Sequence, residues 1–168
     1  LVTAMAGLFR GYRAALLPDS NRVARMWING HIPEEDTVAL DWIDVPRLVA
    51  ASEVEGLREG ARTDMVRAAY DALRSFPAVQ MDPDADADYT REFLRSTRAR
   101  WLITSSTCYE RFFDRGRFTR LPPPPGAELR PEFERKRDFY TALREGYAGW
   151  RTAYEVHTGN GPRVVIYH

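Results

Sequence analysis

The sequence contains few of the residues that mark disulfide scaffolds, cysteine-based metal sites and basic nucleic-acid-binding domains. Among its 168 residues Cys108 is the only cysteine, so an internal disulfide and a cysteine-based zinc site are both excluded. Lysine occurs once, at Lys136, and the 24 basic residues are balanced by 24 acidic ones. Because there is no net positive charge, we do not expect nucleic acid as a partner.

Residues for a metal site are also scarce. The three histidines, His31, His157 and His168, have no metal-ligand spacing between them. The aspartates at 82, 84, 86 and 88 begin like a calcium loop, but Ala87 replaces the required glycine and Phe93 the bidentate glutamate. We interpret this run as a solvated acidic turn, and we predict neither a metal nor a cofactor.

A glycine-rich phosphate loop is missing after the first predicted strand. The residues there run from Asp41 through Trp42 and Ile43 to Asp44, which puts carboxylates where a pyrophosphate needs bare backbone. A nucleotide-binding Rossmann domain is therefore disfavoured, although the fold can be similar without the ligand.

Long apolar runs are absent as well. Residues 1–9 are uncharged, but nine residues are too few to span a bilayer, and they lack the basic start of a signal peptide. Two interpretations stay open: an ordinary buried helix, or the end of a transmembrane helix. We assign residues 1–17 as a membrane-proximal segment and residues 18–168 as a single α/β domain.

The remaining composition is that of a globular domain, with 44% hydrophobic, 12% aromatic and 29% charged residues. Hydrophobic periodicity and turn residues predict alternating helices and strands. The predicted strands are 37–43, 76–81, 100–105, 151–156 and 163–167. The predicted helices are 19–30, 46–56, 63–74, 86–98, a short segment after Ser106 and 131–146.

This alternation predicts a three-layer α/β/α sandwich. The run 37–43 is mostly apolar, as in a strand buried on both faces of a parallel sheet. Pro77 confines the second strand to an edge or a strand start. Turn formers at 157–162 predict that the chain closes with an antiparallel hairpin on a mostly parallel, Rossmann-like sheet.

One stretch of hydroxyl residues lies where an open α/β sheet usually binds its ligand. Ser105 and Ser106 lie at the carboxyl end of the clearest predicted strand, and Asp41 and Asp44 lie at the carboxyl end of the first one. No Gly-x-Ser-x-Gly elbow or nearby histidine supports a serine nucleophile or Cys108 as one. We favour capping of the next helix by the two serines, with ligand binding by these four residues as the alternative.

Several short segments, in order along the chain, resemble the C-terminal soluble region of bacterial membrane glycosyltransferases similar to the dolichyl-phosphate-mannose protein mannosyltransferase family. They are Asp19-Ser-Asn-Arg-Val-Ala-Arg-Met-Trp-Ile, His31-Ile-Pro, Thr37-Val-Ala-Leu, Trp101-Leu-Ile-Thr-Ser-Ser, Tyr109-Glu-Arg-Phe-Phe, Phe139-Tyr-Thr-Ala-Leu and Gly161-Pro-Arg-Val-Val-Ile-Tyr. The resemblance covers about residues 15 to 168, and its motifs are mainly structural.

The resemblance implies a place and a context, but no catalytic residue. In that family the catalytic acids lie in loops beside the transmembrane helices, which this sequence does not contain. It implies an extracytoplasmic (periplasmic) domain of a cell-membrane enzyme that uses a polyprenyl-phosphate-linked sugar. Its partners would be its own transmembrane portion and a glycan or protein acceptor.

Two hypotheses therefore follow. The first is a non-catalytic accessory domain for docking or acceptor recognition. The second is a free-standing small-molecule-binding or hydrolytic domain that acts at the strand edge near Ser105 and Ser106, which requires a pocket with convergent polar groups.

Overall fold

The computed structural model describes residues 19–48, 59–60, 63, 75–113, 131–146, 149–159 and 161–168, and these form a mixed α/β fold. Its helices are α2 (Ser20–His31), α5 (Arg91–Ser96), α6 (Ser106–Tyr109) and α7 (Pro131–Arg144), with 3-10 turns η1 (Asp86–Asp88) and η2 (Glu110–Phe112). Its strands are β1 (Val38–Leu40), β2 (Ala78–Gln80), β3 (Trp101–Ser105), β4 (Thr152–Val156) and β5 (Val164–Tyr167).

These strands form one open sheet in the order β2-β1-β3-β5-β4. β1 pairs in parallel with β2 and β3, whereas β5 is antiparallel to both β3 and β4. β1 is buried along its whole length, as expected for a central parallel strand. The predicted edge position of β2 and the predicted C-terminal hairpin are confirmed, but half of the strand pairings are antiparallel.

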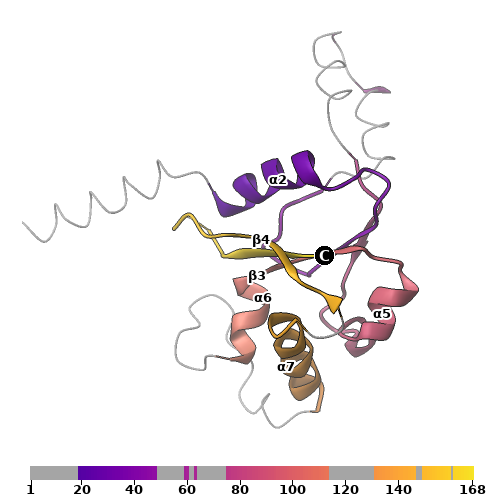
Figure 1. The fold of residues 1–168 in the computed structure, drawn as a ribbon, viewed down its shortest axis with the longest axis vertical. Coiled ribbons are helices and arrows are strands. Elements are labelled where there is room, and N and C mark those ends of the chain that lie inside the picture. Colours follow the sequence, from indigo (N-terminus) through magenta and orange to yellow (C-terminus); the bar gives the residue numbers. More distant parts are fainter. Residues whose placement is uncertain are drawn as a thin grey trace, which may run out of the picture.

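Alternating side chains of the strands feed two separate cores. Val38, Leu40, Trp101 and Ile103 pack with α2, while Ala39 and Leu102 pack on the other side with α5, α6 and α7. Figure 1 shows the same arrangement, with α2 on one face of the sheet and α5, α6 and α7 on the other. This follows from the two-residue period of a strand, which sends neighbouring side chains to opposite faces.

Helix α2 forms as its sequence predicts. The carboxylate of Asp19 caps its first turn by accepting from the Asn21 amide at 3.1 Å. Ala24 and Ile28, four residues apart, are fully buried against the sheet. Beside them the ring of Trp27 stacks between those of His31 and Tyr154, with centroid distances of 4.5 and 4.9 Å. This stack joins α2 to the edge strand β4.

Some predicted helices differ in the structure. The helix predicted over 86–98 begins only at Arg91, because Thr90 caps the Phe93 amide while the aspartates bond to nearby backbone amides instead. Residues 46–48 are not helical. The rest of the helix predicted to residue 56 and nearly all of the one predicted over 63–74 lie outside the described residues.

The turn between β4 and β5 packs on the N-terminus of α2. The Ser20 hydroxyl lies 3.2 Å from the Thr158 hydroxyl and accepts a hydrogen bond from the Thr158 amide. Gly161 has a φ of +92°, and a Cβ added to it would lie 2.5 Å from Oδ1 of Asp19. Glycine is therefore required at position 161 for two reasons, the positive φ of its backbone and the close approach of the Asp19 side chain.

We expect Gly161→Ala to lower the free energy of unfolding by about 1–3 kcal/mol, because alanine is strained at positive φ and displaces the Asp19 cap. Gly30→Ala is the matched control. No atom lies within 4 Å of a Cβ added at Gly30, so alanine should stabilise α2 by up to about 1 kcal/mol. Urea denaturation measures the free energy of unfolding of both variants. Equal effects of the two changes would contradict the requirement for glycine at position 161.

Candidate functional site

The four residues singled out at the sheet edge do lie together. Because β1 and β3 are adjacent and parallel, the segments after Leu40 and at Ser105 meet at the same edge of the sheet. Asp41 and Ser105 are completely buried there, with exposed fractions of 1% and 0%, whereas Asp44 and Ser106 are half-buried.

The carboxylate of Asp41 is the centre of this edge. Its Oδ2 accepts hydrogen bonds from the Thr104 hydroxyl at 2.6 Å and the Tyr140 hydroxyl at 2.8 Å, and its Oδ1 accepts from the Trp42 amide at 2.9 Å. Burial raises the pKa of Asp41, even though the hydrogen bonds from Thr104 and Tyr140 act in the opposite direction. Both carboxylate oxygens are therefore already used inside the protein.

Ser105 has a structural partner too. Its hydroxyl donates to the Ile43 carbonyl at 2.9 Å, and the thiol of Cys108 donates to the same carbonyl at 3.1 Å. Ser105 is the N-cap residue of α6, as predicted, but its side chain makes no capping hydrogen bond. Burial, followed by the nearby Asp41 carboxylate, raises the pKa of Cys108 well above its usual value, which keeps the sulfur a thiol.

Ser106 and Asp44 also fix the chain at this edge. The Ser106 hydroxyl accepts from the Arg163 amide at 3.0 Å, and the Ser106 amide donates to the Arg163 carbonyl at 2.7 Å. The carboxylate of Asp44 accepts from the Thr107 hydroxyl at 2.7 Å. The backbone of Asp44 has a φ of 54°. Aspartate is among the few residues that adopt this left-handed conformation readily. These bonds tie β1, α6 and β5 together.

Two members of the Asp41 cluster were not predicted from the sequence. Thr104 lies in the predicted strand 100–105 and Tyr140 in the predicted helix 131–146, and neither position indicates a contact with Asp41. Tyr140 lies 99 residues from Asp41 in the sequence and reaches it because α7 packs across this face. No local pattern around position 140 signals such a partner.

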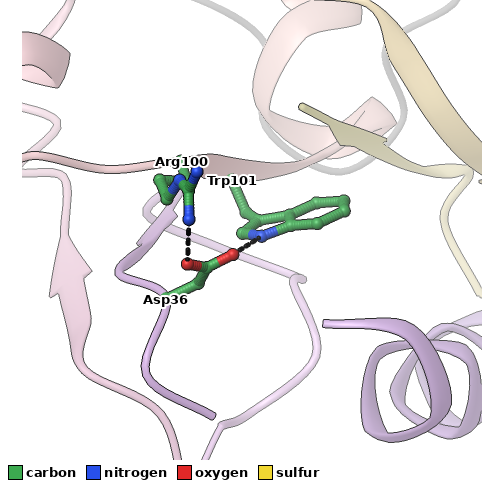
Figure 2. Close-up of polar contacts among 3 residues, drawn as sticks. All are labelled: Asp36, Arg100 and Trp101. Carbon is green, nitrogen blue, oxygen red and sulfur yellow. Dashed lines mark hydrogen bonds and ion pairs between the residues drawn. The ribbon is translucent and has the colours of Figure 1, made fainter. Parts of the chain in front are cut away.

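A second buried carboxylate lies at the opposite end of β1. Figure 2 shows Asp36 between Arg100 and Trp101, which donate to its two oxygens at 2.8 and 2.9 Å. Burial by itself would raise the pKa of Asp36, but the hydrogen bonds from Trp101 and Arg100 outweigh it and lower the pKa. Trp101 in turn stacks on the ring of His168, with centroids 4.2 Å apart. Asp36 therefore fixes the start of β3 and, through the ring of Trp101, the position of His168.

An open polar groove lies over the hairpin strands and borders this edge at Tyr109 and Arg163. Its volume is about 480 Å³, within the range of small-ligand sites. Two arginines and two glutamates balance each other in charge, and two tyrosines add hydroxyls. Its lining residues are Tyr109, Glu110, Phe113, Arg144, Thr152, Glu155, Arg163, Val165 and Tyr167.

Within the groove the charged groups are held at defined positions. The Arg163 guanidinium lies 3.3 Å from the Glu155 carboxylate, and the Arg144 guanidinium lies over the ring of Phe113, 5.0 Å from its centroid. Burial raises the pKa of Tyr167 to about 12, so its hydroxyl stays protonated at neutral pH. The sequence does not indicate this groove, because α6, η2, α7, β4 and β5 each contribute only one or two residues to it.

Comparison of the chain with protein-family models, with curated proteins and with solved structures gives no match. Among the described residues, no helix is long and apolar enough to cross a bilayer. In the same part of the chain, no group of three or more histidine, cysteine, aspartate or glutamate side chains is arranged to hold a metal ion.

We expect Asp41→Asn to destabilise the fold by about 1–3 kcal/mol at pH 4. If the asparagine oxygen accepts from the Trp42 amide, its NH₂ group faces the Thr104 and Tyr140 hydroxyls, which lose their buried acceptor. Since burial raises the pKa of Asp41, its contribution to stability is complete below the unfolded-state pKa of about 3.9 and is lost as the pH rises through the folded-state value. The difference in free energy of unfolding between the wild type and Asp41→Asn should therefore become smaller as the pH rises above 4. Urea unfolding across pH tests this, and parallel profiles would contradict it.

Asp36 should show the opposite pH dependence. Its pKa is lowered, so its stabilising contribution is present above about pH 3.9 and is lost as the pH falls through the folded-state value. At neutral pH, Asp36→Ala should cost about 1–3 kcal/mol because the buried Trp101 indole loses its acceptor. Arg100→Ala, whose side chain is 67% exposed, should cost below about 1 kcal/mol. Thermal unfolding of both variants gives the ranking, and the reverse order would refute it.

Proposed function

We propose that this chain is a non-catalytic accessory domain that recognises the acceptor for a membrane glycosyltransferase-like protein. The observation that carries the proposal is the closed sheet edge. Asp41 and Ser105, the groups that an α/β enzyme would present to a substrate there, are buried and hydrogen-bonded within the protein. A hydrolytic site at Ser105 and Ser106 is therefore the less favoured alternative.

The polar groove supports a recognition role. Its charges are balanced, so it favours neither an anionic nor a cationic ligand, but it offers hydrogen-bond donors and acceptors side by side. Guanidinium forks and carboxylates can each bind two neighbouring hydroxyl groups, and tyrosine hydroxyls can donate or accept. A neutral glycan, which carries many vicinal hydroxyls, is the acceptor that fits this combination best.

The cellular context of the proposal rests on the tail resemblance. In this view the domain lies on the extracytoplasmic side of the cell membrane, beside its own transmembrane portion, and the full protein uses a polyprenyl-phosphate sugar donor. The finer fold assignment belongs to the same proposal: a three-layer, Rossmann-like sandwich that has kept the architecture without the nucleotide site. Helices on both faces of the sheet support it.

The groove can be tested by titrating the isotope-labelled chain with α-1,2-mannobiose and following amide NMR shifts. We expect saturable shifts at Thr152, Glu155 and Arg163, and at least about tenfold weaker binding when Glu155 and Arg163 are both changed to alanine. Arg25→Ala is the control, since it removes one exposed charge from α2 on the other face of the sheet.

Each outcome of this titration decides between the hypotheses. Absence of shifts in the groove would overturn glycan recognition there, and binding of a serine- and threonine-rich peptide at the same residues would replace the glycan with a protein acceptor. Shifts confined to Asp44 and Ser106 would support the hydrolytic alternative.

The membrane context has a separate test. The gene sequence that precedes Leu1 should encode several apolar spans of about 20 residues, and a soluble domain there would refute the membrane context.

A further inference from the structure

Three arginines of the α5 segment converge on one pocket. Arg91 and Arg95 lie four residues apart on α5, Arg98 follows two residues after its end, and all three line a pocket of about 190 Å³ together with Leu94, Ala99 and Trp150. All three are exposed, and within the described part of the chain no carboxylate forms an ion pair with any of them. The nearest acid in sequence, Glu92, lines the adjoining apolar groove instead.

This arrangement does not favour the helix itself. Arg91 and Arg95 are like charges four residues apart, which repel each other on a helix. Arg91 is also the first residue of α5, where the positive end of the helix dipole disfavours a cation. The dipole accounts for Arg95 near the C-terminus, but it does not account for all three arginines.

Arg98 adds backbone strain to this repulsion. Its amide donates to the Arg95 carbonyl and the next amide donates to the Leu94 carbonyl, which is the bonding of a Schellman motif. The residue at this position adopts the left-handed conformation, and Arg98 has a φ of 56° where glycine is the usual residue. The strain places a third guanidinium beside the pocket. Strain of this kind is typical of functional positions.

We propose that this pocket, lined by Arg91, Arg95, Arg98 and Trp150, binds a phosphate group. A phosphate oxyanion offers several acceptors to the planar donors of arginine, and it removes the repulsion among the three guanidinium groups. The Trp150 ring and Leu94 form the apolar wall that excludes water from one side. This site is separate from the groove over the hairpin strands and does not depend on the glycan proposal.

The test uses two probes that distinguish the source of the phosphate. Inorganic phosphate is titrated into the labelled chain at low salt, and the chain is separately sedimented with vesicles of phosphatidylglycerol in phosphatidylcholine. We expect either probe to bind in a salt-sensitive manner. Arg91→Ala and Arg98→Gly should each weaken binding about tenfold. Arg137→Ala is the control, because it removes a half-buried arginine of α7 that does not line the pocket.

Arg98→Gly separates binding from folding. Glycine relieves the left-handed strain, so this variant should raise the urea midpoint while it weakens binding, which a purely structural arginine would not do. Binding of phosphate alone would indicate a soluble phosphate ligand, and binding of the vesicles alone would indicate a lipid headgroup. Binding of neither probe, or equal binding by the Arg98→Gly and Arg137→Ala variants, would overturn the proposal.

Discussion

The buried carboxylate of Asp41 is the interaction on which much of this fold depends. Removing a carboxylate from water is costly unless it is hydrogen-bonded, so the chain has to supply donors wherever this residue is buried. Trp42 supplies one from the adjacent backbone, Thr104 supplies one from β3, and Tyr140 supplies one from α7. The bond from Thr104 ties the segment after β1 to β3, and the bond from Tyr140 ties α7 to the sheet.

This arrangement also explains why the expected ligand edge has no open site. In an open α/β sheet, the carboxyl ends of the strands are where polar groups usually face a substrate. Here Asp41, Ser105 and Cys108 face one another or the Ile43 carbonyl, and Ser106 binds the backbone at Arg163. Open polar surface lies elsewhere, in the groove over β4 and β5 and in the arginine pocket at α5.

Asp36 and Asp41 show how two aspartates of one short segment acquire opposite electrostatics. Both are almost fully buried and both accept hydrogen bonds. Asp36 accepts from the Trp101 indole and from the cationic Arg100, and these donors together lower its pKa. Asp41 has only neutral donors and a fully enclosed carboxylate, so burial prevails and its pKa is raised. The opposite directions of the two shifts therefore reflect both the enclosure of each carboxylate and the charge of its donors.

The sequence by itself determined the local elements with strong patterns: the Asp19-capped helix, the buried β1, the edge strand after Pro77, the strand at 101–105, the long helix after Pro131 and the closing hairpin. Each depends on neighbours within a few residues. It failed at α5, where Thr90 and not an aspartate provides the cap. Only the tertiary structure decided that Ser105 donates to Ile43, 62 residues away, that Tyr140 reaches Asp41, that residues of five elements form the polar groove, and that Trp150 closes the arginine pocket. These contacts join segments whose separation in sequence carries no periodic signal.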